Sequence, residues 1–186
     1  VRGSRHGERV GGTTAGPAFR NELVPVAGRF VLSVSVGRPV LASTGGDWER
    51  TGIAPTIATP PEEALTAAQA HALRRLLAQA DPEDRPQLEA LAEGIEARIR
   101  PAAPAAALTT YAGEYGQRKI WLEDGKLWYR LSDRPRRQLL PLGGHRFTFG
   151  DDPSQRVVFA QAGDRVTALE VGSATGPMQG RYERTD

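Results

Sequence analysis

Short runs of alternating apolar and polar residues, separated by glycine turns, dominate residues 109–186. Three of them carry a turn signal at their centre: RKIWLEDGKLWYRLS (118–132), RQLLPLGGHRFTFGD (137–151) and QRVVFAQAGDRVTALEVG (155–172). Alternation with period two is typical of a strand with one buried face, and Asp-Gly or Gly-Gly pairs favour tight hairpins. The pattern therefore predicts an antiparallel β-meander, curled or partly closed into a half-barrel, as a β-rich domain over residues 111–186.

Aromatic residues concentrate in this C-terminal region and leave two interpretations open. The set comprises Trp121, Trp128, Tyr129, Phe147, Phe149 and Phe159. A small sheet needs aromatic area to bury enough surface, which favours a core. The same residues could instead line a ligand groove.

The other regions differ in composition. Residues 61–100 carry apolar residues at helical spacing and predict a helical hairpin, with Thr59 capping the first helix and Asp81-Pro82 ending it and capping the second. Residues 1–60 are rich in Gly, Val and Thr, and the alternation in 29–37 predicts a strand. Two prolines in a patternless stretch mark residues 101–110 as an Ala/Pro linker. The first 12 residues suggest the end of a helix and a loop leading into a strand, so the true start is expected upstream of Val1.

Composition excludes several function classes. The 39% hydrophobic and 25% charged residues indicate a globular chain, and a net charge of +2 gives no global field for nucleic acid. Absence of cysteine removes disulfides and thiol nucleophiles, and no apolar run approaches the roughly 20 residues of a membrane helix. The three histidines, His6, His71 and His145, show no ligand spacing, so neither a metal site nor a cofactor is expected.

Three segments, in order along residues 10–68, resemble a known family. VGGTTAGPA (10–18) is similar to the strand-to-loop segment that follows the nucleophile helix in tail-specific and tricorn-core serine peptidases, above all the bacterial relatives of interphotoreceptor retinoid-binding protein. GGDWERTGIAPTIATPPEEALTAA (45–68) resembles the Trp-Glu-Gly-x-Gly-Val-x-Pro-Asp segment of that family and the helix start after it. Between them, FVLSVSVGRPV (30–40) resembles the strand written Val-Pro-x-Gly-Arg. The chain departs at Gly12, Arg50 and Thr56, where the family commonly has Glu, Gly and Asp.

The resemblance covers residues 1 to about 80 and implies an α+β chain. Residues 1–60 are then the last part of a Clp-protease/crotonase-like α/β core, and residues 61–100 are a helical hairpin that closes it. The β-rich region resembles a small domain appended to some of these peptidases, whose Tyr-x-Gly-x-Tyr opening is matched by YAGEYG (111–116). Export to the periplasm or the exterior is typical of the family.

The resemblance also assigns site residues. In the tricorn-like branch a Glu of the Trp-Glu-Gly segment supports the catalytic base through a second serine, a role that falls on Glu49; a surface Glu on a glycine-rich loop is the equal alternative. The substrate-cleft loop is expected to comprise Gly11, Thr13, Thr14, Gly16 and Trp48.

The nucleophile and the base of that family precede these segments, so both are expected upstream of Val1. The chain is then an inactive C-terminal fragment of a serine endopeptidase with peptide substrates, prone to self-association through uncovered core surface. The alternative is a non-catalytic binding module that uses the β-rich domain. The basic cluster RLSDRPRRQ (130–138) would in one interpretation contact an acidic partner, although a solvated loop is the commoner outcome.

Overall fold

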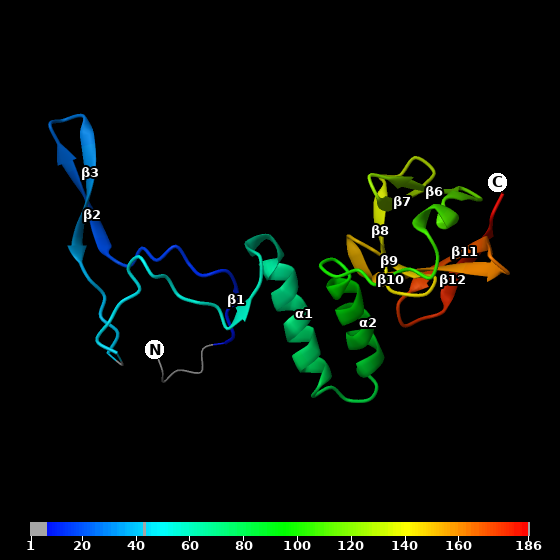
Figure 1. The fold of residues 1–186 in the computed structure, drawn as a ribbon, viewed down its shortest axis with the longest axis horizontal. Helices are drawn as coiled ribbons and strands as arrows, with labels where there is room; N and C mark the ends of the chain where they lie inside the picture. Colours follow the sequence, from blue (N-terminus) through cyan, green and yellow to red (C-terminus); the bar gives the residue numbers. More distant parts are fainter. Residues whose placement is uncertain (1–6, 43, 186) are drawn as a thin grey trace. The chain divides into compact units, whose positions relative to one another are not determined.

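The computed structural model describes residues 7–42 and 44–185 of the chain, which divides into two compact units after Leu65. It is a mixed α/β protein, with two α-helices and a large antiparallel sheet of eight strands in the part described (Figure 1). Residues 1–6, part of the 12-residue stretch predicted as the end of a helix and a loop leading into a strand, lie outside the described residues. A short strand, β1, Val10–Gly11, begins the segment that resembles a strand-to-loop element, and it pairs in parallel with β4, Ile57–Ala58.

The N-terminal unit contains an antiparallel hairpin of β2, Arg20–Val26, and β3, Phe30–Gly37 (Figure 1). The strand predicted over 29–37 is confirmed, whereas β2 was not predicted, because it contains Pro25 and lacks clean alternation. Proline is tolerated here because the two-stranded sheet has only edge strands. Residues 27–29 form the turn, in which Ala27 and Gly28 have positive φ of 50° and 68°.

This hairpin buries almost none of its apolar side chains. Leu23 is 73% exposed and Phe30 is 68% exposed. Among residues 7–42 and 44–65, only Gly11 and Gly16 are buried. A two-stranded hairpin without a packed face is marginally stable in water. The unit therefore presents apolar surface and has no hydrophobic core within its described residues.

The helical hairpin is confirmed, but its predicted caps are wrong. A short 3₁₀ turn, Pro61–Glu63, precedes α1, Ala64–Leu77, and α2 spans Arg85–Glu96. Pro60, not Thr59, occupies the N-cap of the first turn, and Asp84, not Asp81, that of α2; neither makes a side-chain capping bond. The Asp81 carbonyl instead accepts the amides of Asp84 and Arg85 at 3.1 and 3.2 Å.

The second helix packs against strand β10, Asp152–Ala162. Gly94 allows the close approach, since a Cβ there would lie 2.7 Å from the Cβ of Pro153. The buried guanidinium of Arg156 donates to the carbonyls of Ala90 and Pro153 at 2.5 and 2.8 Å, which satisfies buried acceptors on both elements. We expected the helical hairpin of residues 61–100 to close the N-terminal core. Its second helix, α2, instead packs on the sheet of the C-terminal unit.

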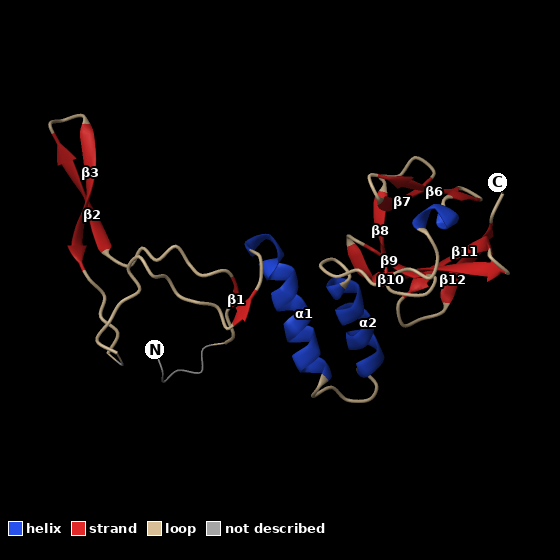
Figure 2. Ribbon diagram, viewed as in Figure 1, coloured by secondary structure: helices blue, strands red, loops and turns tan. Residues whose placement is uncertain are grey.

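The sheet is a meander in which each strand pairs with the next along the chain (Figure 2). Besides β10, its strands are β5 Gly113–Tyr115, β6 Arg118–Glu123, β7 Lys126–Leu131, β8 Arg137–Pro141, β9 Arg146–Phe149, β11 Arg165–Ser173 and β12 Met178–Glu183. A bridge between Tyr115 and Arg184, and a 2.9 Å bond from the Thr185 amide to the Glu114 carbonyl, link the two ends. The predicted meander is confirmed, and it is nearly closed rather than half a barrel.

The interior of this sheet is filled by aromatic residues, and the predicted set divides between its two faces. Tyr129, Phe147, Phe149 and Phe159 are buried, as the core interpretation predicts. For Trp121 and Trp128 the core prediction is wrong. These two residues are paired across β6 and β7, lie on the opposite face of the sheet and are partly exposed. Side chains in a strand alternate between faces, so residues directly opposite each other share one face.

Two tyrosines complete the interior. Tyr111 and Tyr115 are fully buried, and the Tyr111 ring lies 4.9 Å from that of Phe147. Tyr115 donates its hydroxyl proton to the Tyr111 carbonyl at 3.0 Å, and the Tyr111 hydroxyl lies 2.9 Å from Nδ1 of His145. Both tyrosines belong to the YAGEYG element, whose role is therefore packing of the sheet.

The segment predicted as a linker is hydrogen-bonded along the sheet. The Ala102 amide donates to the Pro141 carbonyl at 3.1 Å, and the Ala105 amide to the Gly144 carbonyl at 2.7 Å. A 3₁₀ turn, Leu108–Tyr111, then leads into β5. Residues 101–110 thus belong structurally to the C-terminal unit.

Candidate functional site

The two loops singled out by the resemblance lie side by side in the N-terminal unit. The Thr14 amide donates to the Ile53 carbonyl at 3.2 Å, and the Ile53 amide donates to the Thr14 hydroxyl at 2.9 Å. Two residues beyond Thr14, the Gly16 carbonyl accepts the Arg50 amide at 3.1 Å. Together with the β1–β4 pair, these bonds join residues 10–18 to residues 48–58. We call this the loop junction.

Two glycines allow the loops to approach this closely. Gly16 and Gly52 have φ of 82° and 69°, which disfavours other residues. A Cβ at Gly16 would lie 2.6 Å from the Gly52 nitrogen, and one at Gly52 would collide with the Thr14 carbonyl oxygen. The backbones are therefore in direct contact, and neither position has room for a side chain.

Glu49 fastens the same junction through its carboxylate. Its Oε2 accepts the amide of Ala18 at 2.7 Å and that of Phe19 at 3.3 Å. The side chain is partly buried, and its Oε1 accepts no hydrogen bond from residues 7–42 or 44–185. One oxygen is thus committed to the loop backbone, while the second is available to another donor.

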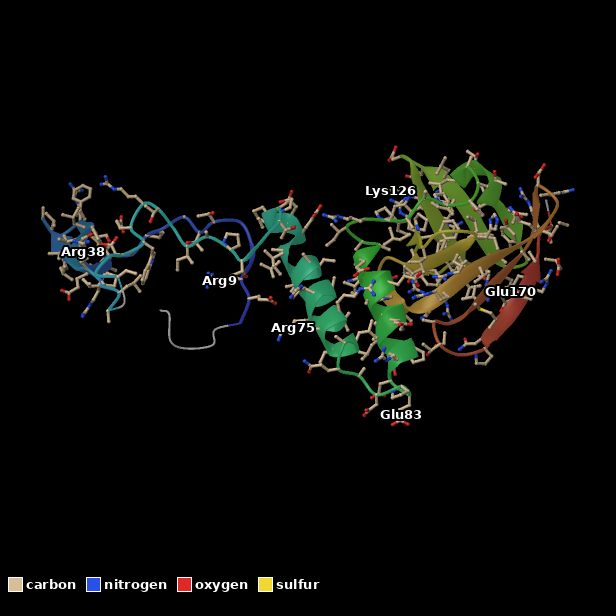
Figure 3. All side chains as sticks on the ribbon, turned by 60° about the horizontal axis from the view of Figure 1, so that its bottom comes forward. Arg9, Arg38, Arg75, Glu83, Lys126 and Glu170 are labelled. Carbon is tan, nitrogen blue, oxygen red and sulfur yellow. The ribbon has the colours of Figure 1, made fainter. Side chains whose placement is uncertain are left out.

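Asp47 orients Glu49 and was not identified from the sequence. Its Oδ1 accepts the Glu49 amide at 2.8 Å, and its Oδ2 accepts Nε of Arg38, a residue labelled in Figure 3. The hydrogen bond from the Glu49 amide lowers the pKa of Asp47 most, and the bond from Arg38 lowers it further. Together they hold this pKa below its ordinary value of 3.8. An Asp two residues before Glu49, in an Asx-turn position after Gly-Gly, was the signal that could have found it.

The lowered pKa of Asp47 predicts how this loop responds to acid. A carboxylate with a depressed folded-state pKa stabilises the fold above its unfolded value, and this contribution is lost as pH falls through the folded pKa. We expect the side-chain carboxyl carbon of Asp47 to titrate with a midpoint below the ordinary value of 3.8, as followed by carbon NMR. Arg38→Gln should raise the midpoint, whereas Arg29→Gln on the hairpin turn should not. A midpoint above 3.8 in the unaltered chain would contradict the assignment.

The structure places the other expected cleft residues as follows. Gly11 is buried in β1. Thr13 and Thr14 are exposed, and the Thr14 hydroxyl is bonded within the junction. Trp48 is partly buried and takes part through its backbone, because its carbonyl accepts the Gly52 amide at 2.9 Å. With Gly16, all five residues lie on the two paired segments.

The junction offers the Glu49 carboxylate, four threonine hydroxyls and ordered backbone, but residues 10–18 and 48–58 contain no serine, histidine or lysine. His71 and His145 lie in the other unit, and His6 is outside the described residues. In the part of the chain that the structure describes, no three His, Asp or Glu side chains gather to hold a metal ion. The junction by itself can orient and polarise a neighbouring group, without a nucleophile of its own.

Comparison of the chain with models of protein families, with curated proteins and with solved structures found no match. Neither helix in the described ranges is both long and apolar enough to cross a membrane.

Proposed function

We propose that this chain is the C-terminal part of a serine-type endopeptidase of the tail-specific/tricorn-core kind. The observation that carries the proposal is the loop junction. Two segments that resemble separate motifs of these peptidases are hydrogen-bonded side by side between Thr14 and Ile53, 39 residues apart in the chain. Had they lain apart, they could not both border one cleft.

The proposal gives Glu49 an electrostatic role. A carboxylate fixed by two backbone amides, with its second oxygen available, can accept a hydrogen bond from the group that orients a catalytic base. It then stabilises the positive charge that the base acquires during acyl transfer. In the alternative, purely structural role, Glu49 only accepts the backbone amides of Ala18 and Phe19. The negative charge of Glu49 would then have no effect on catalysis.

In this proposal the serine nucleophile and the base come from polypeptide that precedes these residues, and the substrates are peptides or proteins. The uncovered apolar side chains of β2 and β3 support a larger core around the junction, because such a surface is rarely left to water. Export from the cytoplasm is part of the same proposal.

Glu49→Gln in the full-length enzyme tests the role. The amide retains a carbonyl oxygen for the Ala18 and Phe19 amides, so folding should be preserved while the charge is lost. We expect kcat/KM for peptide hydrolysis to fall at least about ten-fold, the equivalent of about 1.4 kcal/mol.

A matched change at Glu22, an exposed carboxylate of β2, should leave turnover unaltered as Glu22→Gln. Unchanged turnover in Glu49→Gln removes Glu49 from the mechanism. The nucleophile assignment has a separate test: a fluorophosphonate probe should not label the 186-residue chain, and covalent labelling would contradict the proposal that its reactive serine lies elsewhere.

A further inference from the structure

A depression of about 480 Å³ in the C-terminal unit collects basic side chains from three separate segments. Arg98 follows α2, Lys126 begins β7, and Arg136 and Arg137 stand at the start of β8. Lys126 is labelled in Figure 3. Only Arg136 and Arg137 belong to the basic cluster of residues 130–138. The fold adds Arg98 and Lys126 to these two arginines.

Pairing of charges leaves this depression with excess positive charge. Arg137 is neutralised by Asp151, since its Nε lies 2.9 Å from both carboxylate oxygens. Arg136 donates to Glu123 at 2.8 Å. Arg98 and Lys126 form no ion pair or side-chain hydrogen bond with any residue of the described ranges. Two cationic groups therefore face the depression without a counter-charge, an arrangement that attracts anions.

Arg136 is held in place by Trp128 and Glu123. Arg136 lies 4.3 Å above the ring of Trp128, which pairs across the strands with Trp121. Trp121 in turn donates its indole N–H to Glu123 at 2.9 Å, and Glu123 accepts Arg136. Cation–π stacking and the shared carboxylate restrict the Arg136 side chain, so that it lines the depression in a fixed position.

The rest of the lining consists of Gln138, Leu140, Gly150 and Asp151, whose carboxylate is the one that pairs with Arg137. The Gly150 amide donates to the Gln138 carbonyl at 2.9 Å. The apolar side chain of Leu140 beside unpaired cations suits an organic group that carries a negative charge. A volume of this size exceeds what a lone inorganic anion fills.

We propose that this depression binds an oxyanion, a carboxylate or a phosphate, carried on an organic group. Arg98 and Lys126 supply the charge, because they alone among its cations lack a partner within the described residues, and Leu140 with Gly150 seats the organic part. The site is independent of the loop junction and of peptidase activity.

Binding is tested on the 186-residue chain with two probes, inorganic phosphate and citrate, followed by the amide shifts of Gly150 and Gln138 in ¹⁵N–¹H spectra. We expect saturable shifts with a Kd of about 1–10 mM, weaker at high salt. Arg98→Glu and Lys126→Glu should each raise the Kd at least ten-fold. Lys119→Glu, the same charge change at an exposed residue of β6 outside the depression, should alter it less than two-fold.

Response to phosphate alone assigns a phosphate ligand, response to citrate alone a carboxylate, and response to both supports the oxyanion class as a whole. Absence of shifts at Gly150 and Gln138 with either probe overturns the proposal. So does an equal loss of affinity in the Lys119→Glu variant, because binding would then follow net charge and not this site. Thermal melts that match the unaltered chain show that each variant is folded.

Discussion

Replacing Gly52 by alanine is expected to disrupt the loop junction and to abolish the protection of the Thr14 and Ile53 amides against hydrogen exchange. Gly52 has φ of 69°, and the added methyl group would collide with the Thr14 carbonyl, which is backbone and cannot turn aside. Alanine at positive φ costs about 1 kcal/mol from conformation alone. The collision adds to this, since the two segments must separate to relieve it.

The matched control is Gly45→Ala in the same loop. Gly45 has the same φ of 69°, but nothing lies within 4 Å of a Cβ built there. It therefore carries the conformational cost without the collision, and the Thr14 and Ile53 amides should keep their protection. Equal loss of protection in both variants would mean that the close approach of Gly52 to Thr14 does not hold the junction.

Phe147→Ala is expected to destabilise the C-terminal unit by about 3–5 kcal/mol, the cost of removing a large buried aromatic side chain. Phe147 is fully buried, with ring centroids of Tyr111 and Phe159 at 4.9 and 5.4 Å. Neighbours fixed in a nearly closed sheet cannot collapse into the cavity, so the upper part of the range applies. Urea unfolding followed by far-ultraviolet circular dichroism measures the change in the free energy of unfolding.

Phe19→Ala serves as the control, because it removes the same atoms from a side chain that is 41% exposed. Its cost should stay below about 1 kcal/mol. A comparable cost for both substitutions, or a loss under about 1.5 kcal/mol for Phe147→Ala, would contradict a packed aromatic interior.

Much of the C-terminal fold could be predicted because its information is local. Asp124 and Gly125 adopt φ of 52° and 71°, as the Glu-Asp-Gly turn signal predicts, and the flanking alternation determines which residues share a face. The strands β5 and β12 escaped prediction, since the first is three residues long and the second, MQGRYE, has little apolar alternation. Each of the two becomes a strand chiefly because it pairs with its neighbour in the sheet, β6 for β5 and β11 for β12. The Tyr115–Arg184 bridge also joins β5 to the end of β12.

The candidate site was predictable only in its membership. Gly16, Glu49 and Gly52 attracted notice as parts of two motifs, but nothing in their spacing showed whether the segments meet. Asp47 and Arg38 were missed because their contribution depends on an ion pair between residues nine positions apart. Contacts over such separations follow from the path of the chain and not from local pattern.

By itself, the sequence determined the period-two strands, their tight turns and the two amphipathic helices, because backbone preference and side-chain periodicity act over a few neighbouring residues. Only the tertiary structure decided that β5 meets the end of β12, that Trp121 and Trp128 face outward, and that Arg98 joins Lys126 at one depression. Those outcomes depend on how far the sheet curls. They also depend on which long-range contacts are favourable enough to offset the entropy lost when the chain closes a loop. No short stretch of residues encodes either.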